Sequence, residues 1–198
     1  MRKWVYVPMI TICLLVCGCQ AEEMNAEEVQ SRYRQMTGCA MEAVVRCGQE
    51  GMEWEGELSC TYVPEGRSTV EVLSPESISG IRAVFDDATW HLEYEDTVLN
   101  VLPVSEERIS PAESLLFLMN ALRNGWVLEE NTESWNDQPC CRVTVDQSGE
   151  EGKVISTLWL LQEDMTPLRG EISVGEEIIL TAEFTSFSFY DTIEKQGE

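Results

Sequence analysis

Residues 39–62, CAMEAVVRCGQEGMEWEGELSCTY, contain two runs of alternating apolar and polar side chains. Alternation with a period of two places successive side chains on opposite faces of a β-strand. The runs are separated by residues 48–51, which are polar and bounded by glycine at both ends, so the pattern predicts a hairpin with a four-residue loop. An antiparallel hairpin with one apolar face indicates a sheet that packs this face against a core.

The alternation also predicts how the two strands of this hairpin are aligned. If Cys47 lies opposite Met52, the same register places Cys39 opposite Cys60 on the apolar face. A disulfide between Cys39 and Cys60 is then geometrically possible. The alternative is that both cysteines are buried free thiols, which behave as small hydrophobic side chains.

Strand-like alternation continues through most of the chain. Alternating runs occupy residues 67–73, 81–85, 90–95, 96–102, 126–130, 140–146, 154–161, 167–174 and 177–190. In the last run the apolar phase shifts between Phe184 and Phe187, which indicates a bulge or a position covered on both faces. Together with the hairpin, these runs predict a sheet of about 10–11 strands.

Two segments have helical periodicity instead. Residues 26–36 carry apolar side chains at helical spacing and follow Asn25, a suitable N-cap. Residues 110–125 begin with the N-cap candidate Ser110 and are apolar around most of the helix, which must therefore be covered. We expect an α+β fold: a strongly curved antiparallel sheet, or half-open β-barrel, whose concave side is covered by the N-terminal helix and the inserted apolar helix.

The N-terminal segment is typical of an exported protein. A short basic start precedes an apolar run from Val5 to Val16, which is too short to cross a hydrocarbon core about 30 Å thick. The following Gly18 and Cys19 resemble the lipobox of bacterial lipoproteins, although Val16 stands where leucine is commonest. The resemblance implies cleavage before Cys19 and a covalent diacylglycerol lipid on its sulfur, with no other cofactor. Cys17 is a poorer lipidation site, and a cleaved signal without lipid or a short anchor helix is the alternative.

These observations divide the chain into four parts. They are a lipoprotein signal peptide (1–18), a lipidated tether (19–25), one folded domain (26–192) and a polar tail (193–198). The lipid predicts attachment to the outer face of the cell membrane, or to the outer membrane where one exists. The membrane is thus the first expected partner.

The charge and the motifs exclude several functions. A net charge of −23 repels nucleic-acid phosphates, so no nucleic acid is expected as a partner. The only histidine, His91, falls on a polar strand face among carboxylates, where a solvated side chain is expected. The sequence has no G-x-S-x-G motif and no cysteine spacing typical of a metal site, so we expect neither an enzyme nor a metal site. The acidity serves either solubility or the binding of a basic protein partner.

The order of the predicted elements resembles the LolA/LolB-like lipoprotein-carrier superfamily. The residues that carry the resemblance are the opening helix with Tyr33, the hairpin over 41–62, Ser74 and Pro75, 81–94, 157–172 and the strand that ends at Phe184–Phe187. Membership would imply a half-open barrel over an apolar cavity that binds acyl chains. The lipid anchor departs from the soluble carriers. It is more similar to the acceptor type or to GerS-like spore-germination lipoproteins, in which the domain is the partner of a cortex-modifying amidase.

The candidate site is the apolar face of the sheet and of the inserted helix. The residues expected to line a cavity or to fill a core are Trp54, Leu58, Val70, Phe85, Trp90, Leu92, Phe117 and Leu118. A cavity would take an acyl chain or a lipoprotein, but a packed core has the same alternation, so both interpretations stay open. The second functional interpretation is a lipoprotein that binds or activates a peptidoglycan-modifying enzyme of the envelope through an exposed strand edge or its acidic face.

Overall fold

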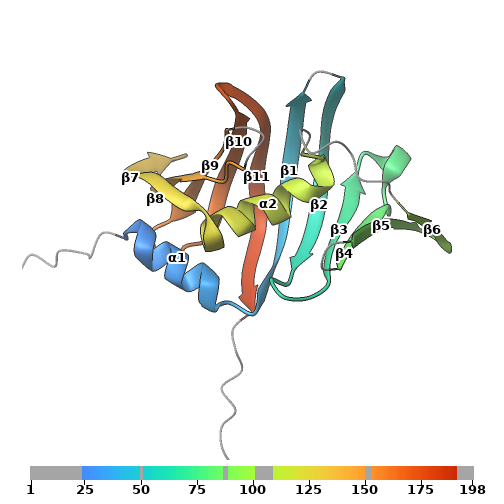
Figure 1. Ribbon diagram of the computed structural model, residues 1–198, viewed down its shortest axis with the longest axis horizontal. Coiled ribbons are helices and arrows are strands. Elements are labelled where there is room, and N and C mark those ends of the chain that lie inside the picture. Colours follow the sequence, from blue (N-terminus) through green and yellow to red (C-terminus); the bar gives the residue numbers. More distant parts are fainter. Residues whose placement is uncertain (1–23, 50, 87–88, 101–108, 150–152, 191–198) are drawn as a thin grey trace, which may run out of the picture.

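The computed structural model describes residues 24–49, 51–86, 89–100, 109–149 and 153–190. Within these residues the chain forms one 11-stranded antiparallel sheet and two α-helices (Figure 1). The predicted signal peptide over 1–18, the lipidation site Cys19 and the tail over 193–198 lie outside the described residues. No helix formed by the described residues is long and apolar enough to span a membrane.

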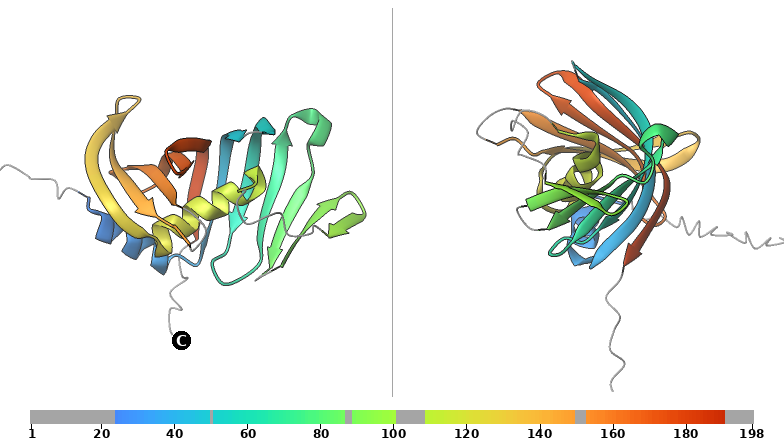
Figure 2. Two further views of the ribbon diagram at one scale, coloured as in Figure 1. Left: turned by 45° about the horizontal axis from the view of Figure 1, so that its top comes forward. Right: turned by 90° about the vertical axis from the view of Figure 1, so that its right-hand side faces the viewer.

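The sheet consists of two meanders that meet in its middle. Its strands are β1 (Gly38–Gln49), β2 (Met52–Tyr62), β3 (Ser68–Ser74), β4 (Arg82–Asp86), β5 (Thr89–Tyr94), β6 (Thr97–Asn100), β7 (Trp126–Trp135), β8 (Gln138–Asp146), β9 (Val154–Leu161), β10 (Pro167–Val174) and β11 (Glu177–Tyr190). Their order is β6-β5-β4-β3-β2-β1-β11-β10-β9-β8-β7, so that β1 joins the meanders by pairing with β11. Figure 2 shows an open, curved sheet, as predicted.

The register predicted for the first hairpin is wrong by two residues. Cys47 lies opposite Trp54, and the ladder continues to the pair Gln49 and Met52. The connection is therefore shorter than expected, and it contains Gly51 at φ +77°, a conformation that glycine adopts without strain. A shift of two residues keeps every side chain on its own face, so alternation alone cannot detect it.

This register separates the two cysteines that were considered for a disulfide. Cys39 lies opposite Tyr62, and Cys60 lies opposite Met41. All five cysteines of the described residues are buried free thiols, which is the alternative arrangement. Burial raises the pKa of the Cys39 thiol to about 12, so it stays protonated at neutral pH and packs as a small hydrophobic group.

The second hairpin, β7–β8, extends further than its sequence pattern indicates. Alternation predicts a strand only over 126–130, whereas β7 continues to Trp135. The two strands are joined by Asn136 and Asp137, whose φ angles of +48° and +64° are those of a two-residue hairpin turn. The prediction ended early because most side chains of this strand are exposed and polar, so no apolar alternation marks its second half.

The bulge predicted in the last strand is confirmed. Along β11, Ser186 lies opposite Glu42 and Phe184 lies opposite Ala43, so that Thr185 is the additional residue. The bulge shifts the phase of the alternation and allows apolar residues before and after it to face the same core.

Both predicted helices form, with the predicted N-caps. The first helix, α1 (Ala26–Gln35), begins after Asn25, whose side chain accepts a hydrogen bond from the Glu28 amide. The second, α2 (Pro111–Asn124), begins after Ser110, which forms a capping box with Glu113. A short 3-10 helix, η1 (Glu76–Ile78), follows β3.

The core lies between α2 and one face of the sheet. The helix packs against β1, β2, β3 and β8–β11, and its C-terminal half lies beside α1 (Figure 2). The largest fully buried side chains of this core are Val29, Tyr33, Met41, Leu58, Leu115, Leu118, Met119, Leu122, Leu158, Leu160, Ile172 and Leu180. We call the sheet face that carries this core the inner face and the opposite one the outer face.

Candidate functional site

The position of α2 on the inner face depends on a small residue in β10. Gly170 lies directly beneath Leu118 of the helix, and a Cβ at position 170 would be 2.6 Å from Leu118 Cδ1. Real Cβ atoms essentially never approach another heavy atom so closely, so the fully buried Leu118 side chain would have to shift within a close-packed core. Glycine therefore sets how near the helix lies to the sheet.

Hydrogen bonds fix α2 along its length. The Tyr62 hydroxyl donates to Asn120 Oδ1 at 2.6 Å, and Gln147 Nε2 donates to the Phe117 carbonyl at 3.1 Å. Near the C-terminal end, Arg123 Nη1 donates to the Tyr33 carbonyl of α1 at 2.6 Å. Burial raises the pKa of Tyr62 to about 12, so its hydroxyl stays a hydrogen-bond donor throughout the physiological range.

The structure brings the eight predicted site residues together in one apolar cluster. Their strand registers place the sheet members on the inner face, and all eight residues belong to the core cluster or pack against it. Leu58, Val70 and Leu118 belong to the closed core. The remaining predicted residues are half-buried and pack against this core: Trp54, Phe85, Trp90, Leu92 and Phe117.

The half-buried residues mark a part of the inner face that the helix leaves partly open. Figure 1 shows that β5 and β6 extend beyond the N-terminal end of α2. There Phe85 and Trp90 stack with ring centroids 5.6 Å apart, and Leu92 lies opposite Leu99, which is 56% exposed. We call these four residues the open apolar face, because they continue the core beyond its helical cover.

Leu99 belongs to this face although it was not among the predicted site residues. A signal for it was present, since it lies within the predicted strand 96–102. The strands before and after the turn at Glu95 and Asp96 are antiparallel, and Leu99 lies opposite Leu92. Residues opposite each other point to the same face, so Leu99 shares the apolar face of Leu92. The antiparallel register therefore extends the candidate site to the edge of the sheet.

Charged side chains near the open apolar face lie on the opposite side of the sheet. His91 Nε2 is 3.0 Å from Glu93 Oε1, and Arg67 Nη2 is 3.1 Å from the same oxygen. The hydrogen bond with His91, followed by the charge of Arg67, lowers the pKa of Glu93. His91 thus lies beside the carboxylate of Glu93 on the outer face, the side that its place in the alternation indicates.

Metal-ligand geometry is not found in the part of the chain that the structure describes. Within the described ranges, no group of three or more histidine, cysteine, aspartate or glutamate side chains could hold a metal ion. The side chains of the open apolar face offer aromatic and aliphatic surfaces for contact.

A cluster centred on Arg169 lies on the outer face of the sheet, over β7 and β9–β11. Arg169 pairs with Glu171 Oε1 at 2.7 Å and Glu183 Oε1 at 3.2 Å. Its guanidinium group lies 4.9 Å from the ring centroid of Trp135 and 5.8 Å from that of Trp159. No local sequence signal predicts this cluster, because its members come from four strands that only the sheet topology brings together.

Two cavities lie away from the predicted site. One, of about 360 Å³, lies between β7–β8 and the two residues that precede α1, and is lined by Met24, Asn25, Glu130, Asn131, Thr132 and Cys141. The other, of about 150 Å³, lies at the bulge and is lined by Ala40, Met41, Glu42, Ser59, Ser186, Phe187 and Ser188. Neither group of residues was singled out by the sequence, because each cavity joins segments that are distant in the chain.

No protein-family model matches the sequence, and no curated protein matches it. Solved structures match over most of its length. An uncharacterised conserved protein from Thermus thermophilus is 14% identical with a TM-score of 0.49, over 87% of this chain and 92% of that one. LprF from Mycobacterium bovis is 12% identical with a TM-score of 0.49, over 87% and 95% of the two chains. A LolA superfamily protein from Nitrosomonas europaea is 11% identical with a TM-score of 0.42, over 85% and 95%.

At sequence identities this low, the similarity to these structures is a similarity of the backbone fold alone. The class of this protein is therefore defined by its own strand order and register: an open, curved antiparallel sheet with two helices and a partly open apolar inner face.

Proposed function

We propose that this protein is a non-enzymatic binding module that holds an apolar ligand, such as an acyl chain or the lipid of a lipoprotein, against the open apolar face. The observation that carries the proposal is the continuity of this face with the core. Phe85, Trp90 and Leu92 pack against buried residues on one side and are only half-covered on the other. Each methylene group of a ligand that leaves water here contributes about 0.8 kcal/mol.

In this function α2 is the cover of a half-barrel of the LolA/LolB type, and the ligand enters at its N-terminal end. The half-buried Phe117 lies on the helix and packs against the core. An acyl chain seated on the open apolar face would therefore contact sheet and helix together, as ligands do in pockets that bury most of their surface.

We infer further that the domain works while attached to a membrane through the lipid on Cys19. The support is the sequence: a basic start, a short apolar run and the Gly18–Cys19 pair. An anchored module cannot diffuse between membranes, so it would receive or hold its ligand at the outer surface of one membrane. The intact mass of the chain purified from its host tests this, because a mass that matches an unmodified Cys19 contradicts it.

A fluorescent sixteen-carbon fatty acid, titrated into the purified full chain, tests the apolar ligand. Leu99→Glu places a carboxylate on the open apolar face and should weaken binding at least about tenfold, since burying an unpaired charge is costly. The matched control is Val98→Glu, because Val98 is 60% exposed and lies opposite Glu93, on the outer face. Its affinity should stay within about twofold of the wild type. Equal losses in the two variants, or no binding by the wild type, would reject the proposal.

A second candidate function is a GerS-like lipoprotein that binds or activates an envelope or cortex enzyme. It is supported by the net charge of −23, which suits a basic protein partner, and by the position of β6 and β7 as the two edge strands of the sheet formed by the described residues. Crosslinking in the native host, followed by isolation of the chain, should return one reproducible envelope protein. Repeated isolation without such a protein would reject this function.

A further inference from the structure

Among the residues that the structure describes, no strand pairs with the outer edge of β7, which is long. β7 ends the sheet on one side and has ten residues, whereas the strand at the other end, β6, has four. Every second residue of an edge strand directs its backbone N–H and C=O groups away from the sheet. Natural edge strands are commonly protected by charged side chains, especially lysine, or by proline. β7 contains neither lysine nor proline, and the charged residues that it carries are three glutamates, which favour a basic partner strand over an acidic one. Its one irregularity, between Val127 and Glu129, leaves Glu129–Trp135 in continuous register with β8.

Large apolar side chains stand at the start of this edge. Trp126 is 76% exposed, more than any other large hydrophobic residue in the described part of the chain, and Leu128 is 50% exposed. Tryptophan at such exposure is typical of residues that a protein partner covers. The edge thus offers both backbone hydrogen bonds and apolar contact.

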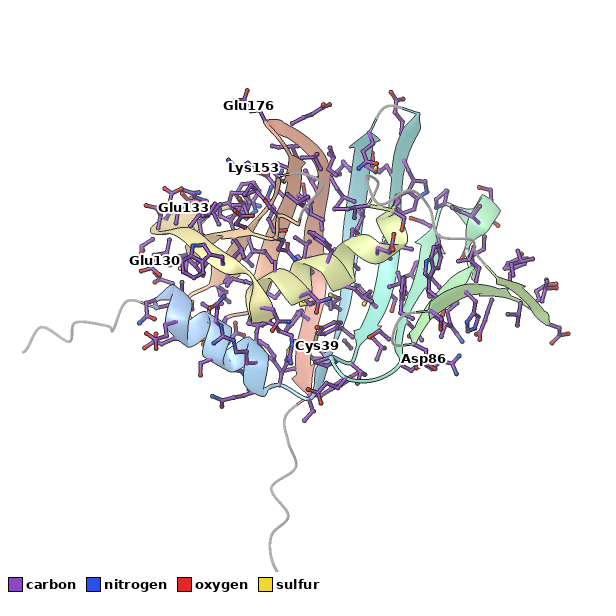
Figure 3. All side chains as sticks on the ribbon, viewed as in Figure 1. Cys39, Asp86, Glu130, Glu133, Lys153 and Glu176 are labelled. Carbon is purple, nitrogen blue, oxygen red and sulfur yellow. The ribbon has the colours of Figure 1, made fainter. Side chains whose placement is uncertain are left out.

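The cavity of about 360 Å³ runs beside the same strand. Three of its lining residues, Glu130, Asn131 and Thr132, belong to β7, and Met24 and Cys141 form its apolar wall. Glu130 Oε2 accepts a hydrogen bond from the Ala26 amide at 2.6 Å, which holds the carboxylate beside the first turn of α1 (Figure 3). An extended chain added next to β7 would direct alternate side chains toward this cavity.

A lysine side chain suits this cavity best. Its aliphatic stem can lie along Met24 and Cys141, while its ammonium group reaches the carboxylate of Glu130 and the hydroxyl of Thr132. Glu129 and Glu133, on the outer face of β7, share one arginine, Arg142, between two carboxylates. The local charge of the edge is therefore negative, like the charge of the whole chain.

We propose that the β7 edge binds an extended, lysine-containing segment of a partner protein, which adds to the sheet as a further strand and inserts one lysine side chain into the cavity beside Glu130. This surface deepens the second candidate function, on which it rests. It is independent of the apolar ligand, because β7 and the open apolar face lie at opposite ends of the sheet.

The test uses the full chain and a fluorescent peptide of alternating lysine and valine. Its length of about nine residues lies within the usual range for strands and is close to that of β7. A second peptide has the same sequence but carries N-methyl groups on alternate backbone nitrogens, so that it cannot form a ladder. Fluorescence anisotropy should show that the unmodified peptide binds at least about tenfold more tightly, because main-chain hydrogen bonds supply the affinity of strand addition. Hydrogen exchange of the β7 amides should slow when the unmodified peptide is bound.

The substitution Glu130→Gln tests whether a lysine side chain of the bound peptide lies beside Glu130. The variant keeps an oxygen that can accept from the Ala26 amide but loses the charge, and it should weaken binding of the unmodified peptide about tenfold. The control is Glu53→Gln, the same charge change at an exposed position of β2, which should alter binding less than about twofold.

Three results would overturn the proposal: equal binding of the two peptides, exchange protection outside β7, or equal effects of the two substitutions. An envelope partner that crosslinks equally well to the wild type and to Glu130→Gln would leave the second candidate function standing and reject β7 as its surface.

Discussion

The two ends of the inner face have the same alternation but opposite exposure. Leu160 on β9 and Leu99 on β6 are both leucines that point to the inner face, yet Leu160 is 0% exposed and Leu99 is 56% exposed. The difference is the cover: α2 packs against β8–β11, whereas β6 extends beyond α2 (Figure 2). Alternation therefore identifies the apolar face of a strand, and the covering element decides whether that face becomes core or surface.

The half of the sheet that α2 covers should also have the higher free energy of local opening. Its strands β8–β11 are 8–14 residues long, and Arg169 of β10 is the centre of an ion-pair cluster on their outer face. The strands of the open half, β4–β6, are 4–6 residues long. Fewer ladder hydrogen bonds and fewer buried contacts lower the free energy of local opening. In the proposed function, the end of the sheet with the lower free energy of opening admits the ligand, whereas the covered end stays folded.

The largest expected effect follows from this contrast. Leu160→Ala should lower the free energy of unfolding by about 2–5 kcal/mol, because it leaves a cavity in closed core. Leu99→Ala, the same change on the open apolar face, should cost less than about 1 kcal/mol, since its side chain loses little burial. Urea unfolding of the two variants measures both values. Similar losses would mean that the two halves are equally packed, and the comparison would fail.

The local features of this contrast are those that the sequence predicts well. The caps at Asn25 and Ser110 and the bulge near Phe184 follow from short-range rules, and the structure confirms all three. The inner or outer face of each strand residue follows from alternation in the same way. Such features depend on neighbours within a few residues, so one sequence is enough to place them.

The remaining features depend on residues that are distant in the chain. The hairpin register was wrong by two residues because the shift conserves both faces, and only the turn at Gly51 distinguishes the alternatives. The hydrogen bond between Glu130 and the Ala26 amide joins residues more than a hundred positions apart. The same holds for the open apolar face, since the length of sheet that α2 covers is a property of the assembled domain and not of any one strand.

A smaller effect should sharpen the role of the helix as cover. Gly170→Val places a branched side chain where even a Cβ would collide with Leu118, and overpacking of this kind costs about 1–3 kcal/mol. Gly48→Val is the matched control, because a Cβ at this glycine of β1 meets no atom within 4 Å. Thermal unfolding should show a lower midpoint for the first variant only. If the control is destabilised equally, the loss belongs to glycine in strands and not to the contact with α2.

The smallest expected effect concerns the thiols of the covered core and appears at alkaline pH. Burial raises the pKa of Cys39 from its ordinary value of 9.0 to about 12, so above pH 9 the unfolded chain releases a proton that the folded chain keeps. The stabilisation from this group is complete below pH 9 and is lost as the pH rises toward 12. At pH 10 the loss is about 1 kcal/mol.

The substitution Cys39→Ala removes the thiol that titrates and adds a packing defect that does not depend on pH. The variant should therefore lose less free energy of unfolding than the wild type between pH 8 and pH 10 in urea titrations. Equal losses would place Cys39 outside the dry core and would weaken the distinction between the covered and the open half of the sheet.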